Sequence, residues 1–391
     1  MQDAVIIEAV RTPFGKRGGC FRDTRPASLL AHVLSAVMER SGLPSDRVED
    51  VICGTVSQAG EQGANIGRLG SLLAGFPPEV PGVTLNRMCG SGQQAVHFAS
   101  QAIAAGDAQY VVACGVESMT RVPMFLDLTL GPPFRDFSSL NPELLARYPL
   151  VHQAESAERL ATLYSMTRSE CDAMARESHR RAHAARDAGH FKEIVPTPAR
   201  TAGGAPLLAS GDEGVRAVID EAKIAALPLL FRPPGQGVIT AANSSQMSDG
   251  AAAVLIGEAA RARSDGLRIR ARFRARVAIG SDPVIQFTGV AAATKLALRR
   301  AGLSMADLDW IEINEAFAPA VIAWAREMEP DMSKVNPWGG AMAHGHPLGA
   351  TAAGLLAKSL SGLEHSGGQF GLVTACIGHG MATATIIERV H

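Results

Sequence analysis

Residues 301–314 read AGLSMADLDWIEIN, and residues 41–54 read SGLPSDRVEDVICG on the same plan. In each stretch a glycine ends a helical segment, a polar turn follows, and an apolar run typical of a buried strand completes the unit. The helix expected after Cys89 and the strand that follows it have counterparts in a helix after Gly349 and its following strand. All these matches lie about 260 residues apart, which indicates a duplicated fold rather than a short-period repeat.

Short apolar runs alternate with alanine-rich helical stretches along most of the chain, which favours an α/β fold of stacked layers. The expected strands are residues 4–8, 50–54, 110–115, 251–257, 310–314, 369–375 and 383–388. The expected helices are residues 28–41, 92–105, 167–188, 289–301, 316–327 and 349–361.

Residues 120–245 interrupt this alternation, because they are rich in proline and irregular turns and contain one long amphipathic helix over 169–188. We interpret them as an insertion that projects over the active face, where substrate-binding loops usually lie. The predicted division is a first half at 1–119, completed by about 246–267, an inserted loop domain at 120–245, and a second half at 268–391.

The composition fits a large core under a mixed surface. The chain has 391 residues, 47% of them hydrophobic and 19% charged, which is enough for two or three packed units. Its net charge is -1 and no lysine or arginine run stands out, which argues against a nucleic-acid partner. The arginines from Arg268 to Arg276 alternate at strand spacing, so they fit either the solvated face of an edge strand or a site for an anionic nucleotide tail.

The sequence carries no address signal that we recognise. Residues 1–10 are not a secretory leader, residues 388–391 are not a peroxisomal signal, and no run of about 18 apolar residues occurs. The six cysteines are spaced too irregularly for a disulfide framework or a CxxC metal site. We therefore expect a cytoplasmic protein without a membrane span.

Cys89 lies in a glycine-rich turn, NRMCGSG at residues 86–92, directly before an expected helix. A thiol at a helix N-terminus feels the positive end of the helix dipole, which favours the thiolate and predicts a lowered pKa. The N–H groups of the turn can also stabilise an oxyanion. A buried structural cysteine in a tight turn is the alternative interpretation.

Three further residues lie at comparable places. His346 stands between Gly345 and Pro347 in a turn before a helix, which makes it a candidate base for Cys89. Cys376 ends an apolar strand, and a second thiol is useful where a proton must pass to or from a carbon atom. Asn314 ends another strand, where it can orient the imidazole, hold a water, or simply cap the next helix.

Four blocks stand out together, namely NRMCGSG at 86–92, NEAFA at 314–318, GGA and GHPLG within 339–349, and CIG at 376–378. Stretches at residues 8–13, 117–120 and 243–250 accompany them. In this order the blocks closely resemble the active-site blocks of the thiolases, and the resemblance covers essentially the whole chain. Several independent motifs agree, so the resemblance is specific.

The resemblance implies an α/β thiolase fold, in which duplicated βαβαβαββ halves form a five-layer αβαβα core and the inserted loop domain binds coenzyme A. It implies an acyltransferase that acts on 3-oxoacyl-CoA and acetyl-CoA, with coenzyme A as a substrate and no metal or redox cofactor. The family forms dimers and tetramers, so we expect a homodimer or homotetramer.

The catalytic roles carried over by resemblance fall on three residues. Cys89 is the nucleophile that takes up the acyl group as a thioester, and His346 activates it. Cys376 exchanges the proton with the α-carbon of acetyl-CoA, or with its carbanion during cleavage.

The remaining roles concern oxyanions and substrate. One oxyanion site uses His346 with a water held by Asn314, and the other uses the N–H groups of Cys89 and Gly378. Ser245 lies against the pantetheine arm, and His152 faces the acyl-thioester end.

Five positions depart from the family pattern. His344 and His379 stand where apolar residues or glycine are usual, and Trp338 replaces a smaller residue. Gln153 and Gln286 fall where short-chain biosynthetic thiolases carry methionines that line the acyl pocket. The two glutamines favour a degradative enzyme of β-oxidation that accepts longer or unusual 3-oxoacyl chains.

The alternatives are a short-chain acetoacetyl-CoA thiolase working in the biosynthetic direction and a non-catalytic acyl-CoA or lipid-binding protein on the same scaffold. A decarboxylating condensing enzyme of the same superfamily is disfavoured by Cys376, and a Cys–His hydrolase by the second thiol and the duplication.

Overall fold

The structure is a computed structural model, which describes residues 2–129 and 137–390. One large sheet runs through it. Its strands are β1 (Ala4–Arg11), β2 (Gly15–Lys16), β3 (Asp50–Gly54), β4 (Gly82–Leu85), β5 (Tyr110–Ser118), β8 (Ser248–Glu258), β9 (Ala271–Gly280), β10 (Trp310–Ile313), β11 (Phe370–Ile377) and β12 (Met381–Arg389). They lie in the order β10-β11-β12-β9-β1-β8-β5-β3-β4, and β2 pairs with β8.

The pairing directions show the duplication directly. In the first half β3 is parallel to β5, β5 is antiparallel to β8, and β8 is antiparallel to β1. In the second half β10 is parallel to β11, β11 is antiparallel to β12, and β12 is antiparallel to β9. The halves join at one end of β1, where Val5 and Ile6 pair with Arg272 and Ala271. The predicted duplicated α/β fold is confirmed.

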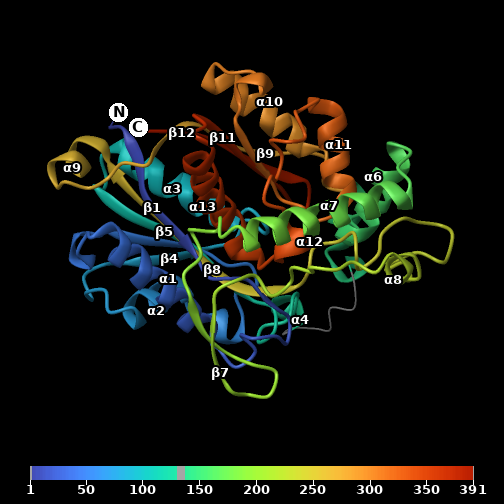
Figure 1. Cartoon of the computed structure of the whole chain (residues 1–391), viewed down its shortest axis with the longest axis horizontal. Coiled ribbons are helices and arrows are strands. Elements are labelled where there is room, and N and C mark those ends of the chain that lie inside the picture. The colour runs from blue at the N-terminus through green and yellow to red at the C-terminus, as the bar shows by residue number, and fades with distance from the viewer. Residues whose placement is uncertain (1, 130–136, 391) are drawn as a thin grey trace.

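Helices form the other layers (Figure 1). Two helices, α3 and α13, pack on each other between the two halves of the sheet. The first half carries α1 and α2 on its outer face, and the second half carries α10 and α11. The bounds are α1 (Pro26–Ser41), α2 (Ile66–Leu73), α3 (Ser91–Ala105), α10 (Gly289–Ala301), α11 (Ala318–Met328) and α13 (Leu348–Ser366).

The sequence of α13 explains its central place. Every residue from Leu348 to Leu363 is buried, and most are alanine, glycine or leucine, so the helix has no polar face to turn to solvent. Lys358 is the charged exception, and it pairs with the buried Glu312 at 2.9 Å.

The repeated glycines have a conformational reason. Gly42 ends α1 with φ 73°, and Gly302 ends α10 with φ 69°. This left-handed conformation is costly for residues with a side chain, so the repeated motif contains glycine at both places. A short 3-10 turn and then β3 or β10 follow each glycine.

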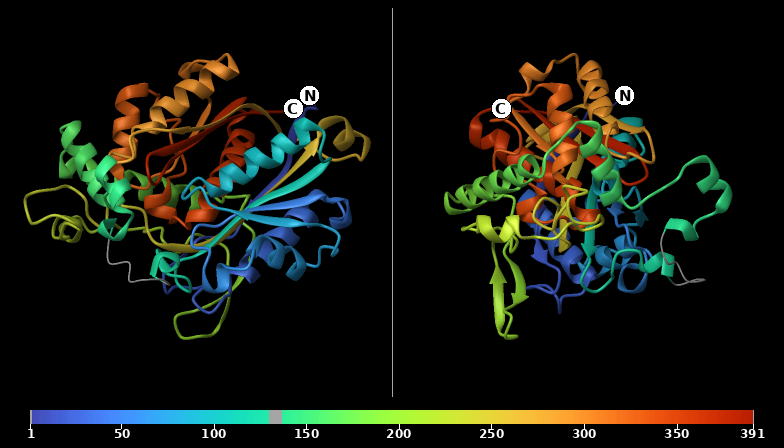
Figure 2. Two further views of the ribbon diagram at one scale, coloured as in Figure 1. Left: turned by 180° about the vertical axis from the view of Figure 1, so that it is seen from behind. Right: turned by 90° about the vertical axis from the view of Figure 1, so that its right-hand side faces the viewer.

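The inserted segment lies beside these layers (Figure 2). The long helix expected over 167–188 is present as α7, and its first residue follows Thr167, which forms a capping box with Glu170. The β6–β7 hairpin projects away from the sheet. No helix among the described residues is long and apolar enough to cross a membrane. The elements are α4 (Leu126–Thr129), α5 (Pro142–Arg147), α6 (Gln153–Leu163), α7 (Arg168–Asp187), β6 (Thr197–Arg200), β7 (Pro206–Ala209) and α8 (Glu221–Ala225).

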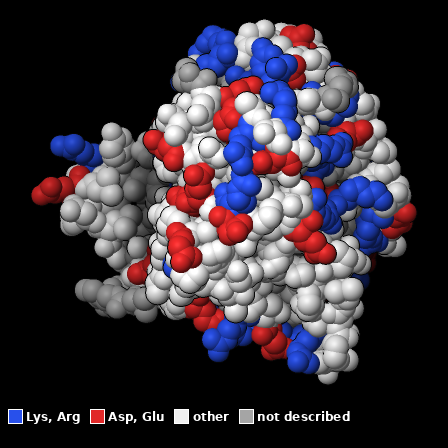
Figure 3. Space-filling view, turned by 90° about the vertical axis from the view of Figure 1, so that its left-hand side faces the viewer, with Lys and Arg blue, Asp and Glu red and all other residues white. Residues whose placement is uncertain are grey.

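The alternating arginines belong to β9 and its approach, and Arg268, Arg270, Arg272 and Arg274 are paired with carboxylates. Arg270 lies 2.7 Å from Glu364, while Arg272 and Arg274 lie 2.7 and 3.0 Å from Glu388. The edge-strand interpretation was wrong, because β9 lies inside the sheet order between β12 and β1. Acidic and basic side chains are interspersed on the face shown in Figure 3, without a broad field of one sign.

Candidate active site

The turn that carries Cys89 is packed tightly against β11. Met88 adopts a left-handed φ of 47°, and α3 begins just after Gly90. A Cβ on Gly90 would lie 2.3 Å from Cδ1 of Ile377, which explains why glycine is needed there. The turn therefore lies directly beside the end of the strand that carries Cys376.

The two thiols are buried on neighbouring segments, since Gly90 lies against Ile377. Cys89 is 4% exposed and Cys376 is 2% exposed. Burial, and then the charge on Cys89, raise the pKa of the Cys376 thiol, while the Ala316 N–H faces this sulfur and opposes the shift. Gly378 directs its N–H at Cys89. Residues from opposite ends of the chain thus meet at one point.

The electrostatics of Cys89 differ from the expectation. Burial raises the pKa of its thiol to about 11, although its own N–H, the Gly378 N–H and the Gln153 amide act in the opposite direction. The predicted lowering by the helix dipole was wrong for the free enzyme, because desolvation outweighs the donors. Cys89 therefore needs a base to become a nucleophile.

His346 is held as a neutral base. Burial lowers its pKa to about 4. Its backbone N–H lies 3.0 Å from the Gln246 carbonyl and 3.2 Å from Ser248 Oγ. Leu348, two residues further on, packs in the same apolar cluster as Cys89. The turn after His346 and the turn of Cys89 are thus in contact.

Thr351 determines which nitrogen of the imidazole carries hydrogen. Its hydroxyl donates to the Pro347 carbonyl at 2.8 Å, so its oxygen must accept from Nδ1 of His346, which lies 2.6 Å away. The lone pair is then on Nε2, which faces Asn314 Nδ2 at 3.4 Å. Nε2 is therefore the unprotonated nitrogen, and in this structure it accepts from the Asn314 amide.

Asn314 supplies both a donor and an acceptor. Its backbone N–H donates to Thr374 at 3.0 Å, which fixes it beside β11. Its Oδ1 is buried and has no hydrogen-bond partner among the described residues, so it can accept from a water or a substrate. The capping interpretation is not supported, because the N-cap of α11 is Phe317.

A cavity of about 170 Å³ opens beside Cys89. His152, Gln153 and Gly378 line it together with Cys89. His152 also caps α6, since its Nδ1 accepts from the Ala154 N–H at 3.2 Å, and its ring stacks on Phe231 at 4.6 Å. The other lining residues are mostly apolar: Val56, Met88, Met124, Phe125, Leu128, Phe137, Leu140 and Leu348, with Ser57, Asn86, Asp127, Gln286 and His379.

A second cavity, of about 630 Å³, contains Ser245. The Ser245 N–H donates to the Ala316 carbonyl at 2.9 Å, and the N–H of Ala316 faces Cys376. Arg216 and Lys223 line the same cavity. A cavity with the charged side chains of Arg216, Lys223 and Asp220, the last two ion-paired at 3.2 Å, therefore begins beside Ala316, whose N–H faces the second thiol.

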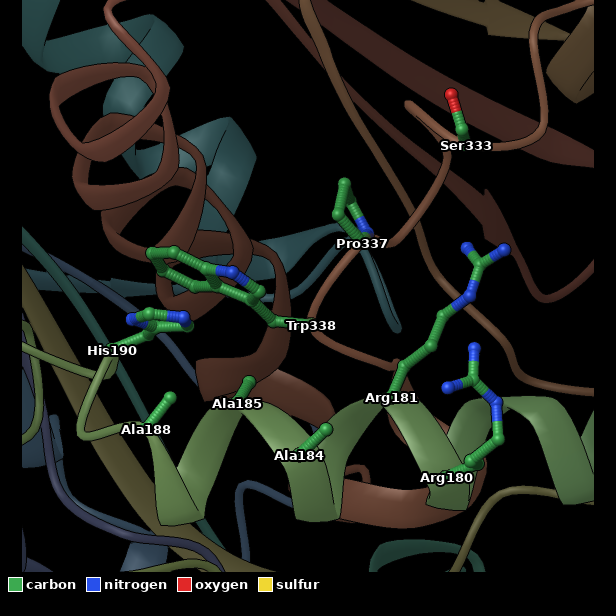
Figure 4. A pocket seen from close by; sticks show the side chains of 9 residues that line it. All are labelled: Arg180, Arg181, Ala184, Ala185, Ala188, His190, Ser333, Pro337 and Trp338. Atoms are coloured by element: carbon green, nitrogen blue, oxygen red, sulfur yellow. The ribbon is translucent and has the colours of Figure 1, made fainter.

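A third cavity, of about 540 Å³, lies between α7 and the loop at 333–338 (Figure 4). Trp338 lines it and stacks on His190 at 5.3 Å, with Arg180 and Arg181 further along α7. Its lining includes none of Cys89, His346 and Cys376.

Sequence reasoning missed several supporting residues. Thr351 lies just inside the helix after His346, where a hydroxyl can reach back to the imidazole. Gln153 was seen only as a residue lining the acyl pocket, although its amide faces the Cys89 sulfur. Glu117 is fully buried and accepts from the N–H groups of Val56 at 2.9 Å and Gly349 at 2.9 Å. These contacts join segments that no local pattern connects.

Comparison with known proteins gives one consistent result. The model of the thiolase N-terminal domain matches residues 4–260, and that of the thiolase C-terminal domain matches residues 267–389. The chain is 44% identical to the steroid 3-ketoacyl-CoA thiolase FadA6 of Mycobacterium tuberculosis, over 100% of this chain and 95% of that protein. It is 41% identical to the 3-ketoacyl-CoA thiolase of Serratia proteamaculans over 100% of both. The crystal structure of human mitochondrial 3-ketoacyl-CoA thiolase matches with a TM-score of 0.90 at 33% identity, covering 100% of this chain and 99% of that one.

Proposed function

The chain belongs to the thiolase family, and we propose that it cleaves 3-oxoacyl-CoA with coenzyme A into acetyl-CoA and a shortened acyl-CoA, or catalyses the reverse condensation. The observation that carries this proposal is that Cys89 and Cys376 are both buried and close enough for the charge of one to shift the pKa of the other, with the Gly378 N–H directed at the first sulfur. A hydrolase needs the first thiol only, whereas cleavage of a carbon–carbon bond needs a proton donor for the departing carbanion.

The first half-reaction forms the acyl-enzyme. His346 Nε2 takes the proton of Cys89, and the thiolate adds to the 3-oxo carbon of the substrate. The N–H groups of Cys89 and Gly378 stabilise the oxyanion. When the bond between carbons 2 and 3 breaks, the protonated His346 and a water held by Asn314 stabilise the enolate, and Cys376 gives it a proton.

The raised pKa of Cys376 suits this role. A thiol that stays protonated near neutral pH is available to donate, whereas a thiolate is not. Donation leaves a thiolate at Cys376 and a proton on His346.

The second half-reaction restores the enzyme. The Cys376 thiolate takes the proton of coenzyme A, whose sulfur attacks the thioester on Cys89. The Cys89 sulfur leaves and recovers its proton from His346. Both thiols and the neutral imidazole are regenerated, and coenzyme A is consumed as a substrate without a metal or redox cofactor.

Coenzyme A is proposed to lie in the cavity of Ser245. Its pantetheine arm would pass Ser245 toward Cys376, and its phosphates would face Arg216 and Lys223. This placement is supported by the shared lining of the cavity and by the Ser245–Ala316 hydrogen bond beside Cys376. His152 would contact the acyl-thioester end in the smaller cavity.

The smaller cavity supports an acyl tail of medium length. Its volume is about 170 Å³, and an apolar protein cavity of about 150 Å³ holds a benzene molecule. The tail of 3-oxooctanoyl-CoA beyond the 3-oxo carbon is of that size. We therefore favour a degradative thiolase of β-oxidation over an acetoacetyl-CoA thiolase, and the names of the two bacterial relatives agree with this choice.

The test is coenzyme A-dependent thiolysis of 3-oxooctanoyl-CoA against acetoacetyl-CoA by the purified protein. We expect a higher kcat/KM for the eight-carbon substrate. A preference for the four-carbon substrate would instead identify an acetoacetyl-CoA thiolase, and binding of both without turnover would identify a non-catalytic carrier.

We also propose a cytoplasmic homo-oligomer, a dimer or tetramer. The proposal is supported by β4, which stands at the end of the sheet order, and by exposed apolar side chains beside it. Leu72 and Leu73 of α2 are 42% and 58% exposed, and Val83 of β4 is 45% exposed. Light scattering should give a multiple of the chain mass for the wild type and a smaller mass for Leu73→Glu, whereas a wild-type monomer would contradict the proposal.

A further inference from the structure

A buried cluster of four polar side chains lies next to the turn that carries His346. Arg11, at the end of β1, donates to both oxygens of Asp212 at 2.6 and 3.0 Å, and its Nε donates to Glu193 at 3.1 Å. His344, the last residue of α12 (Ala341–His344), lies with Nδ1 2.7 Å from Asp212 Oδ2. Each of the four residues is at most 5% exposed.

Both ring nitrogens of His344 face acceptors. Nε2 lies 2.8 Å from the Trp338 carbonyl, which can only accept. Although burial opposes it, Arg11 and then His344 hold the pKa of Asp212 well below its usual range, so the carboxylate also only accepts. With a hydrogen on each nitrogen, the ring would donate toward both acceptors and carry a positive charge.

The charge balance of the cluster agrees with this assignment. Arg11 and His344 contribute two positive charges, and Asp212 and Glu193 contribute two negative charges. Burial of charges is tolerated only where they are paired, and removing one partner leaves an uncompensated charge at large cost. An apolar residue at position 344 would leave this cluster with a net negative charge.

The carbonyl that receives His344 is itself held in place. The Trp338 ring stacks on His190 on the cavity side (Figure 4), and Phe191 packs edge-on against both Trp338 at 5.7 Å and His344 at 5.2 Å. The His344 ring is thus held between the Trp338 carbonyl and the Asp212 carboxylate.

Asp212 begins the segment that enters the proposed coenzyme A cavity. Its Oδ1 accepts from the Phe14 N–H at 2.7 Å, which fixes the start of the segment. A Cβ on Gly214 would lie 2.6 Å from the Ala343 carbonyl, so the segment packs directly on the residue before His344. Arg216 then lines the cavity, and its N–H donates to His179 at 3.2 Å.

We propose that His344 is a positioning residue for coenzyme A, which as a buried cation fixes residues 212–216 so that Arg216 is held in the cavity; this inference rests on the proposed function. His346 is held by Ser248 and Thr351, whereas Gln246 contacts both His346 and Gly214. Loss of His344 therefore weakens coenzyme A binding and leaves proton transfer largely intact.

The first test is His344→Gln, which keeps a polar side chain of similar reach and removes the charge. We expect KM for coenzyme A to rise about tenfold while kcat stays within about twofold. Calorimetric titration of coenzyme A into the protein should show the same loss of affinity. Unchanged coenzyme A affinity in this variant would overturn the inference.

The second test is a rescue by charge. Adding Asp212→Asn to His344→Gln returns the cluster to a neutral Arg11–Glu193 pair, so the double variant should bind coenzyme A more tightly than His344→Gln alone. If the losses of coenzyme A affinity in Asp212→Asn and His344→Gln simply add in the double variant, the charge-balance argument is wrong.

Controls separate this inference from misfolding and from failure of the proposed function. His97→Gln removes another buried histidine, which bonds Thr385 at 2.7 Å in the core, and should lower the melting temperature without changing KM for coenzyme A. A wild type that neither binds coenzyme A nor cleaves 3-oxoacyl-CoA would refute the proposed function. If the wild type does both and His344→Gln binds coenzyme A as tightly as the wild type, only the role of His344 is refuted.

Discussion

At the scale of single residues, the reaction depends on which nitrogen of His346 is unprotonated. The hydroxyl of Thr351 is committed to the Pro347 carbonyl, so it accepts from Nδ1 and leaves the lone pair on Nε2, the atom proposed to take the proton of Cys89. Burial raises the pKa of Cys89 to about 11, so the thiol is protonated at neutral pH and the proposed reaction requires a base. The same burial lowers the pKa of His346 to about 4, so the base is not already protonated at neutral pH.

Thr351→Val should test whether the reaction depends on the tautomer of His346. Valine keeps the shape of threonine but cannot accept from Nδ1, so the tautomers of His346 are no longer distinguished. We expect kcat for thiolysis to fall at least about tenfold with little change in KM. Thr294→Val is the matched control, because Thr294 makes the same bond to a carbonyl four residues earlier at 2.9 Å, remote from the sulfurs. Equal losses of kcat in both variants would contradict the role of Thr351.

At the scale of elements, direct contact between backbones aligns the segment that carries His346 with the segment that carries Cys89. The start of α13, which follows His346, fits between the ends of β3 and β5. A Cβ on Gly115 would lie 2.1 Å from the Gly349 carbonyl, and a Cβ on Gly349 would lie 2.5 Å from the Gly54 carbonyl. Glycine at these positions lets the helix approach the sheet closely, and that approach brings His346 toward Cys89.

Gly115→Ala should therefore displace the start of α13. The added methyl meets backbone atoms that cannot rotate away, so we expect a loss of about 2–4 kcal/mol in the free energy of unfolding and a marked fall in kcat. Denaturant unfolding and thiolysis measure the two effects. The control is Gly280→Ala in β9, where an added methyl has nothing within 4 Å and should be nearly neutral. A fully active, stable Gly115→Ala enzyme would show that the close approach is not needed.

The elements also show what local sequence can predict. The repeated glycines Gly42 and Gly302 mark helix ends because a left-handed residue leaves a strong local signal. The five proposed catalytic residues were found from their motifs, and the structure brings Cys89, Cys376 and Gly378 together and sets Asn314 beside His346. Their roles remain predictions until they are measured.

The sequence could not predict properties that depend on contacts between segments far apart in the chain. The rise in the pKa of Cys89 comes from burial under segments far away in the chain, so the local helix dipole was a poor guide. The Arg11–Asp212 contact spans 201 residues, and nothing near either residue indicates the other. The pairing of β9 inside the sheet was missed for the same reason, since its arginines resemble those of an exposed edge.

At the scale of the whole molecule, buried neutral histidines make stability depend on pH. Burial lowers the pKa of His97 to about 3, and it lowers those of His179 and His346 to about 4, against an ordinary value of 6.5. The unfolded chain therefore binds more protons than the folded chain below pH 6.5. Stability from these groups is fully present above that pH and is lost as the pH falls toward 4. Glu312, whose pKa burial raises to about 7, acts in the opposite direction.

The melting temperature should accordingly fall as the pH is lowered from 7.5 to 5. Each of these histidines contributes a slope of about 1.4 kcal/mol per pH unit. Burial also raises the pKa values of Glu117, Asp50 and Asp249, which act with Glu312, and lowers those of His152, His190 and His379, which act with the three histidines. His97→Gln should make the dependence shallower by removing one of the three. A melting temperature that rises on acidification would contradict the assignment of neutral buried histidines.

The central claim is that Cys89 carries the acyl group while Cys376 handles the proton of the carbon acid. The most direct measurement is the intact mass of the protein after incubation with 3-oxooctanoyl-CoA without free coenzyme A, in the wild type, Cys89→Ser and Cys376→Ser. We predict a hexanoyl adduct on Cys89 of the wild type, none in Cys89→Ser, and slow adduct formation in Cys376→Ser, where the enolate lacks its proton donor. With hexanoyl-CoA, which needs no carbon–carbon cleavage, Cys376→Ser should still become acylated at Cys89. An adduct that persists in Cys89→Ser, or forms equally fast from 3-oxooctanoyl-CoA in Cys376→Ser, would contradict the account.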